Sequence, residues 1–99
     1  MSVELNGRQF EWDTDKALSN VKKHGVSFEN AALVFTDSSR IEIFDAEHSL
    51  EEERWLTIGR VNTVLCVIYT ERNDVTRLIS ARKATAREKR LYYAGQKVY

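Results

Sequence analysis

The sequence predicts a single α+β domain over residues 1–99, in which two helices near the N-terminus precede an antiparallel meander of about four strands and a C-terminal helix. Three observations predict this class. Apolar residues recur at helical spacing before residue 40, β-branched and alternating residues dominate residues 54–82, and a helix-capping residue follows at Thr85. A chain of 99 residues can bury one modest core, so a second domain is not expected.

Helical spacing of apolar residues predicts the first helix at about Asp15–His24, directly after a short strand with alternating residues at Gln9–Trp12. Asp13 is a suitable N-cap because its carboxylate can accept hydrogen bonds from the first free amides of a helix. Gly25 adopts left-handed backbone angles at low cost, so the helix is expected to stop there.

N-capping residues predict two further helices. One begins after Ser27 and ends near residues 37–39, and the other begins after Thr85 with Glu88 in its first turn. The residues expected to pack from these two helices are Phe28, Ala31, Ala32 and Phe35 in the first, and Leu91, Tyr92 and Val98 in the second.

Four β-rich runs are predicted to form the meander. Short polar segments at Asn62-Thr63 and Asn73-Asp74 separate the last three runs, which are therefore expected to form consecutive hairpins. The acidic stretch at residues 45–53 is expected to be a solvated loop. The four runs are Arg40–Phe44, Arg54–Val61, Val64–Glu71 and Val75–Arg82.

Charge is unevenly distributed although the net charge is zero. Residues 1–53 contain five Lys/Arg and twelve Asp/Glu, whereas residues 54–99 contain ten Lys/Arg and three Asp/Glu. The basic second half favours a polyanionic or acidic ligand. The alternative is that the two halves neutralise each other in the fold.

Several function classes are not expected. The longest apolar run, Val64–Tyr69, is too short to cross a bilayer, and residues 1–4 show no export signal, so a cytoplasmic protein is predicted. Cys66 lies within that run and is expected to be a small buried hydrophobic residue. Neither a metal site nor a cofactor is expected, because His24 and His48 lie far apart and the four glycines match no phosphate-binding loop.

A series of basic residues is the strongest chemical feature of the second half. The planar guanidinium group of arginine binds phosphate oxygens in pairs and can stabilise a charged phosphoryl transition state. In an unbroken strand, Arg77 and Arg82 would face opposite sides of the sheet. The series consists of Arg54, Arg60, Arg72, Arg77, Arg82, Arg87 and Arg90, with Lys83, Lys89 and Lys97.

Phosphoryl transfer without a metal also requires groups that accept and donate protons. His24 is one candidate for this chemistry, although a histidine at the end of a helix can equally serve capping or packing. Glu53 is another candidate, with a surface ion pair to Arg54 as its alternative. His48 is expected to be solvated, and Tyr69 is expected in the core or at its rim.

Seven segments in order resemble the BrnT toxin family, across about residues 9–93. In the first half they are Phe10-Glu11-Trp12-Asp13, Lys23-His24-Gly25-Val26-Ser27-Phe28-Glu29 and Ala31-Ala32-x-Val34-Phe35. In the second half they are Asp45-x-x-His48-Ser49, Glu52-Glu53-Arg54-Trp55-x-Thr57-Ile58-Gly59, Val67-x-Tyr69-Thr70-Glu71-Arg72 and Arg77-x-Ile79-Ser80-Ala81-Arg82-Lys83-Ala84-Thr85.

The resemblance implies a RelE-like fold and a metal-independent endoribonuclease that inhibits translation and growth as the toxin of a type II toxin-antitoxin system. It also implies a BrnA-like partner, an antitoxin with a ribbon-helix-helix domain through which the complex contacts DNA. The positions to which catalysis is assigned are His24, Glu53, Arg54, Arg72, Arg77 and Arg82, and those assigned to RNA binding are Lys83, Arg87 and Arg90. A non-catalytic module that binds nucleic acid or the antitoxin remains the alternative, because arginine serves both functions.

Overall fold

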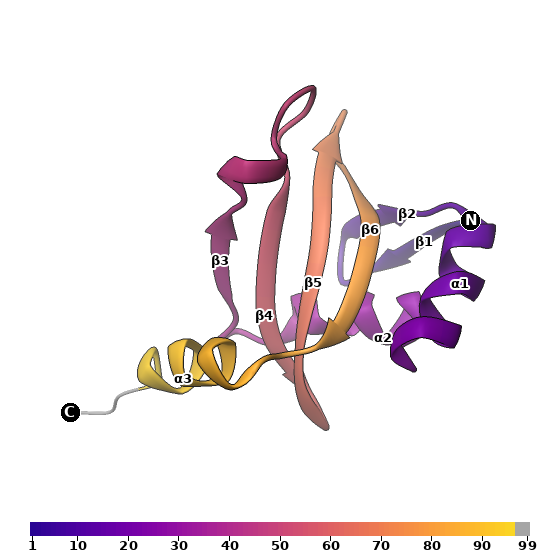
Figure 1. Ribbon diagram of the computed structural model, residues 1–99. Helices are drawn as coiled ribbons and strands as arrows, with labels where there is room; N and C mark the ends of the chain where they lie inside the picture. The colour runs from indigo at the N-terminus through magenta and orange to yellow at the C-terminus, as the bar shows by residue number, and fades with distance from the viewer. Residues whose placement is uncertain (97–99) are drawn as a thin grey trace.

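The structure is a computed structural model that describes residues 1–96. In that range three α-helices accompany a six-stranded mixed sheet with the strand order β1-β2-β6-β5-β4-β3 (Figure 1). The strands are β1 (Ser2–Leu5), β2 (Arg8–Glu11), β3 (Ile41–Phe44), β4 (Trp55–Val61), β5 (Thr63–Arg72) and β6 (Val75–Lys83). The helices are α1 (Thr14–His24), α2 (Phe28–Leu33) and α3 (Ala86–Ala94), and single 3₁₀ turns follow α2 at Val34–Thr36 and β3 at Ala46–His48.

The prediction of an antiparallel sheet of about four strands is wrong, because residues 1–96 contain six strands and one parallel pair. The missed strand β1 pairs with β2 through a tight turn at Asn6 and Gly7, whose φ angles are 51° and 83°. These positive angles match the turn type that follows the right-handed twist of a hairpin. Strand β2 then pairs in parallel with the distant β6, which extends the sheet beyond the predicted meander.

The capping residues behave as predicted. Asp13 accepts hydrogen bonds from the amides of Asp15 and Lys16, and Gly25 ends α1 with a left-handed φ of 69°. Thr85 and Glu88 form a complete capping box at the start of α3. No helix within residues 1–96 combines the length and apolar character needed to span a membrane.

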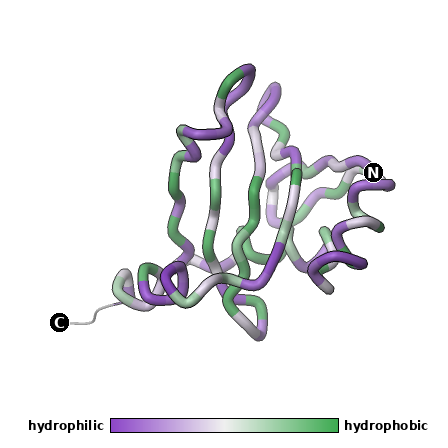
Figure 2. Tube along the Cα trace, viewed as in Figure 1, coloured by the Kyte–Doolittle hydropathy of each residue, from purple (hydrophilic) through white to green (hydrophobic). Residues whose placement is uncertain are grey.

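Two apolar clusters lie on opposite faces of the sheet. The larger one packs α1 and α2 against the sheet around Phe10, Phe28 and Val67. The smaller one packs α3 against the other face around Cys66, Ile58 and Tyr92. Cys66 is fully buried, as predicted, and burial raises the pKa of its thiol to about 12. Figure 2 shows the hydrophobic segments along the middle of the central strands, with hydrophilic residues at the upper loops.

A β-bulge in β6 decides which arginines share a face. Arg77 lies opposite Thr70 and Arg82 lies opposite Cys66, with a register shift between Ile68 and Tyr69. Because Thr70 and Cys66 are four residues apart on one regular strand, both arginines emerge on the same face. The prediction that Arg77 and Arg82 face opposite sides assumed an unbroken strand. Because the bulge lies between them, they face the same side.

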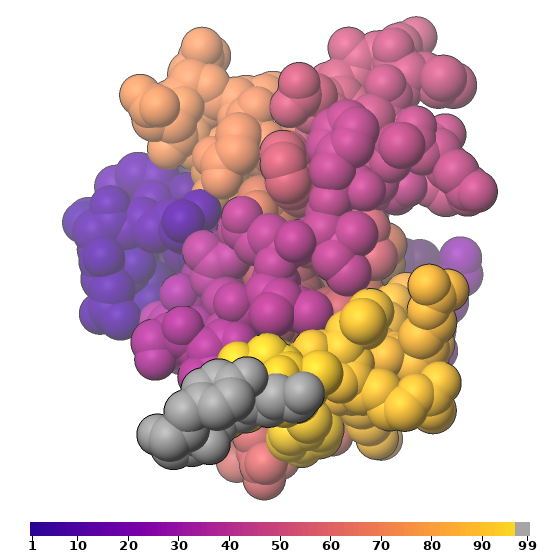
Figure 3. Space-filling model, turned by 90° about the vertical axis from the view of Figure 1, so that its left-hand side faces the viewer, coloured from indigo at the N-terminus to yellow at the C-terminus, as the bar shows by residue number. Residues whose placement is uncertain are grey.

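We call this surface the open face, because α1 and α2 pack on the other side of the sheet. Helix α3 crosses its lower end, and the segment that follows β3 stands at its upper end (Figure 1). In profile, both features project beyond the sheet on the same side, with a recess between them (Figure 3). The open face is therefore a shallow trough that an extended ligand could enter.

Candidate active site

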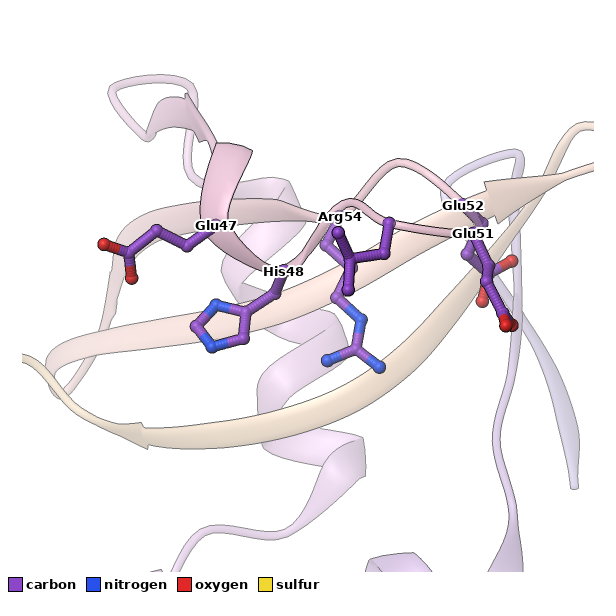
Figure 4. Close-up of a pocket in the computed structure, with 6 residues that line it drawn as sticks. Glu47, His48, Glu51, Glu52 and Arg54 are labelled. Atoms are coloured by element: carbon purple, nitrogen blue, oxygen red, sulfur yellow. The ribbon is translucent and has the colours of Figure 1, made fainter.

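A pocket of about 340 Å³ lies at the upper end of the sheet, between the 3₁₀ turn after β3 and the start of β4. We call it the histidine pocket. Figure 4 shows the side chains of His48 and Arg54 next to each other and pointing the same way, whereas Glu47 points away from them. The residues that line the pocket are Glu47, His48, Leu50, Glu51, Glu52 and Arg54.

His48 has the geometry of a group that transfers protons. Its Nδ1 atom lies 2.9 and 3.1 Å from the two carboxylate oxygens of Asp45. The Asp45 side chain is only 15% exposed, whereas that of His48 is 62% exposed. A carboxylate bound to Nδ1 fixes the orientation of the ring and leaves Nε2 available to a substrate. The pair can therefore act as an oriented general base or acid.

Hydrogen bonds hold the loop that carries these groups. The amide of Asp45 donates to the carbonyl of Arg54 at 2.9 Å, which extends the pairing of β3 and β4 by one step. The hydroxyl of Ser49 donates to the carbonyl of Asp45 and accepts from the amide of Arg54. Buried Thr70 donates to the carbonyl of Glu53 at 2.7 Å. His48 and Arg54 are thus held at fixed positions although they lie in a polar loop.

Two further predicted arginines lie near this pocket. Arg72 donates from Nε and Nη2 to the two carboxylate oxygens of Glu52, at 2.8 and 2.9 Å. These bonds lower the pKa of Glu52, and the charges of Arg54 and Arg77 lower it further. Arg77 also lies 3.4 Å from a carboxylate oxygen of Glu11. The structure therefore brings Arg54, Arg72 and Arg77 to one end of the open face.

Arg82 occupies the other end, where it anchors α3. Its two terminal nitrogens donate to the two carboxylate oxygens of Glu88, at 2.6 and 2.9 Å. Hydrogen bonding from Arg82 lowers the pKa of Glu88 to about 2, and the same carboxylate caps α3 through the amide of Thr85. The contacts of the Glu88 carboxylate with Arg82 and with the amide of Thr85 therefore both stabilise the fold.

The predicted RNA contacts near α3 remain exposed. Lys83 ends β6, and Arg87 and Arg90 lie along the outer surface of α3. Within residues 1–96, none of the three forms an ion pair. Lys97 and Val98 lie outside the described residues, so the predictions made for them remain predictions.

Neither of the two predicted proton-transfer residues lines the histidine pocket. His24 ends α1 and lines a separate pocket between α1 and β6. Glu53 is exposed, and its backbone carbonyl accepts a hydrogen bond from Thr70. Within the described range, no group of three or more His, Cys, Asp or Glu side chains is placed to hold a metal ion.

His48 is solvated as predicted, with 62% of its side chain exposed, but its contact with Asp45 was not predicted. A histidine in an acidic loop is usually solvated, and that interpretation ignored its spacing from Asp45. Residues three apart in a helical turn can contact each other, so the segment Asp45-Ala46-Glu47-His48 contained the signal. The 3₁₀ turn at Ala46–His48 brings the two side chains together.

Some charges of the two halves do neutralise each other, as the alternative interpretation held. Among residues 1–96, three ion pairs join the acidic half to the basic half: Arg8 with Glu71, Arg72 with Glu52, and Arg77 with Glu11. Each pair includes a side chain that is at least one-third exposed. Such pairs contribute little stability and can be exchanged for another anion.

Comparisons with known proteins identify a matching family and a similar solved structure. A family model described as "Ribonuclease toxin, BrnT, of type II toxin-antitoxin system" matches residues 12–88. The crystal structure of the Brucella abortus ribonuclease toxin BrnT is similar at a TM-score of 0.60, with 23% sequence identity over 77% of this chain and 95% of that one. No curated protein matches the sequence.

Proposed function

The chain belongs to the BrnT family, the ribonuclease toxins of type II toxin-antitoxin systems, and from that premise we propose that it cleaves RNA without a metal ion at the histidine pocket. The observation that carries this proposal is the contact of His48 with Asp45 beside Arg54. This arrangement supplies an oriented proton acceptor and a fixed positive charge in one pocket. Metal-independent cleavage of RNA requires both.

In the proposed reaction, the 2′-oxygen of a ribose attacks the adjacent phosphorus and the bond from phosphorus to the 5′-oxygen breaks. Nε2 of His48 takes the proton of the 2′-hydroxyl, while Asp45 stabilises the imidazolium that forms. Water in the open pocket gives a proton to the departing 5′-oxygen. The products are a 2′,3′-cyclic phosphate and a 5′-hydroxyl end.

Arginines supply the electrostatic stabilisation in this scheme. Arg54 lines the pocket and stabilises the charge on the phosphorane, which gains negative charge as the 2′-oxygen attacks. Arg72 and Arg77 bind the phosphates on either side, because RNA can displace their partly exposed carboxylate partners. Lys83, Arg87 and Arg90 extend the basic surface along the trough. Arg82 acts through the position of α3.

The family membership implies an antitoxin partner and an RNA substrate. We propose further that the partner is a BrnA-like ribbon-helix-helix protein, that the toxin reaches DNA only within their complex, and that it acts in the cytoplasm to inhibit translation and growth. A domain of 99 residues has little surface to spare, and a standard interface takes about 800 Å² from each partner. The antitoxin is therefore expected to cover part of the open face and to compete with RNA.

Cleavage of single-stranded RNA in EDTA by the wild type, by His48→Gln and by Arg54→Ala tests the proposal. We expect the wild type to remain active, His48→Gln to lose activity by about 10²- to 10⁴-fold and Arg54→Ala by about 10²-fold. Circular dichroism and a melting curve check that each variant folds. Activity that returns only with added Mg²⁺ would contradict the proposal, and RNA binding without cleavage would favour the non-catalytic binding module.

A further inference from the structure

A second pocket, of about 250 Å³, lies between α1 and the edge of β6. We call it the lysine pocket. Strand β2 pairs with only the first part of β6, at Val75, Thr76 and Arg77, so the edge beyond that point faces α1. The residues that form the pocket include Lys16, Ser19, Asn20, Lys23, His24 and Ser80.

The base of this pocket is fixed by Asn20. Its buried side-chain amide donates to the carbonyls of Val26 and Ala81 at 2.9 and 2.8 Å and accepts from the amide of Ala81 at 3.1 Å. This side chain therefore takes the place of a neighbouring strand along the exposed edge of β6. The hydroxyl of Ser80 donates to the side-chain oxygen of Asn20, so the polar groups that remain available around the pocket are the two lysines, the histidine and the hydroxyl of Ser19.

The chemistry of the pocket suits an anion. No carboxylate lines it, and within residues 1–96 neither Lys16 nor Lys23 forms an ion pair. The two lysines are seven residues apart on α1, so they project from the same side of the helix about 10 Å apart along its axis. The hydroxyl of Ser19 adds a hydrogen-bond donor, whereas that of Ser80 donates to the side-chain oxygen of Asn20 at 3.4 Å.

Interaction with the helix dipole explains the positions of only some of the basic residues in the lysine pocket. Cations near the C-terminal end of a helix are favourable, which accounts for Lys23 and His24 in the last turn of α1. Lys16 lies in the first turn, where the dipole disfavours a positive charge. The helix dipole therefore does not account for Lys16.

The lysine pocket continues the open face. Ser80 lies opposite Ile68, which puts it on the same face as Arg77, and it also lines the lysine pocket. Their partners Ile68 and Thr70 are two residues apart on β5, so Ser80 and Arg77 lie about 7 Å apart along the sheet. Helix α1 stands directly beside β6 at this edge (Figure 1). A strand of RNA that crosses Arg77 would therefore reach Lys16 and Lys23.

We propose that the lysine pocket binds the phosphate backbone of single-stranded RNA at a distance from the cleaved bond. This inference rests on the proposed function, because it extends the path of the same substrate. Lys16 and Lys23 each contact a phosphate, and the hydroxyl of Ser19 donates to a phosphate oxygen. The pocket adds affinity for RNA long enough to span both sites and takes no part in the chemistry at His48.

Binding and cleavage of two RNAs, of about 4 and about 12 nucleotides, test the proposal with the double variant Lys16→Ala/Lys23→Ala. The short RNA fills only the histidine pocket, whereas the long one reaches both sites. We expect the double variant to bind the long RNA about fivefold more weakly and to cleave the short RNA at the wild-type rate. The slope of log affinity against log salt should fall by about 1.4, since each single-strand phosphate contact contributes about 0.7.

Lys22→Ala is the matched control for Lys23→Ala, because Lys22 is the next residue on the same helix and does not line the pocket. Lys23→Ala should lower the salt slope by about 0.7, and Lys22→Ala should leave it unchanged. Equal effects of the two substitutions, or unchanged binding of the long RNA by the double variant, would overturn the proposal. Loss of antitoxin binding with normal RNA binding would also overturn it, by assigning the pocket to an acidic protein segment. If the wild type binds RNA without cleaving it, the proposed function fails, and the salt slopes still decide the role of the lysine pocket.

Discussion

The two ends of the open face hold their arginines in different ways. At the histidine pocket, Arg72 and Glu52 are paired with 52% and 34% of their side chains exposed. At the α3 end, Arg82 and Glu88 are paired with only 30% and 14% exposed. The first pair is close to water and can exchange partners, whereas the second is shielded and also caps a helix.

This difference shows that the burial of the carboxylate partner decides what an arginine can do. A phosphate can replace an exposed carboxylate at little cost, so Arg72 can bind RNA as the proposed function requires. If a phosphate displaced Glu88 from Arg82, the shielded carboxylate of Glu88 would lose its arginine partner. The capping box of Thr85 would also be disturbed. Arginines of equal appearance in the sequence are thus divided into a binding group and an anchoring group.

The largest expected effect concerns the histidine pocket. Asp45→Asn removes the carboxylate that orients His48, and we expect RNA cleavage to fall by about 10²- to 10³-fold with RNA binding preserved. Glu47→Gln is the control, because Glu47 lines the same pocket but points away from His48 (Figure 4). Cleavage rates and filter binding would be measured for both variants, and equal losses would refute the role of Asp45.

At the other end, Arg82→Ala is expected to act on stability. It leaves the carboxylate of Glu88 unpaired and shielded, at a cost of about 2 kcal/mol, which lowers the melting temperature by about 10 °C. Arg87→Ala, on the exposed surface of α3, should change stability by less than about 0.5 kcal/mol. If Arg82→Ala melts like the wild type and loses cleavage, Arg82 contacts RNA and the division into two groups is wrong.

Acid should lower the stability that Glu88 contributes at the α3 end, in a defined range of pH. The pKa of Glu88 is lowered in the folded protein from 4.5 to about 2, so its contribution is fully present above pH 4.5 and is lost as the pH falls towards 2. Glu88→Gln cannot lose this contribution, and its stability should depend less on pH in that range. Urea unfolding of both proteins between neutral pH and pH 2 provides the comparison. Parallel curves would show that Glu88 does not couple folding to protonation.

The smallest effect is expected for Glu52→Gln, which releases Arg72 at the histidine pocket. Stability should change little, because the pair is exposed. RNA affinity should rise about threefold, because a negative charge next to the phosphate path is removed. Glu88→Gln should give no such gain. Fluorescence titration of the two variants with one RNA measures this contrast, and weaker binding by Glu52→Gln would show that the ion pair itself positions Arg72.

Local signals in the sequence were sufficient for most of the helices and the meander. Caps at Asp13, Ser27 and Thr85 predicted where the helices begin, because a cap depends on residues within one turn. The missed strand β1 also had a local signal, since Asn6-Gly7 is a strong hairpin turn that the reasoning overlooked. The parallel pairing of β2 with β6 had none, because it joins residues more than 60 positions apart.

The candidate site was predictable in its residue types and less so in its geometry. The arginines of residues 54–82 were recognised, but the bulge in β6 that brings Arg77 and Arg82 to one face depends on the pairing with β5. The role of Glu88 as partner of Arg82 also arises only when α3 folds back onto the sheet. The contact of His48 with Asp45 was predictable from their spacing, because the two residues are three positions apart in one helical turn.

The end groups of cleaved RNA test the central claim most directly. RNA digested by the wild type in EDTA should carry 2′,3′-cyclic phosphate and 5′-hydroxyl ends, because the 2′-oxygen is the nucleophile in the scheme centred on His48. His48→Gln should yield almost none of these products while it folds normally. Fragments with 3′-hydroxyl and 5′-phosphate ends, or equal cleavage by His48→Gln, would contradict the assignment of the histidine pocket as the active site.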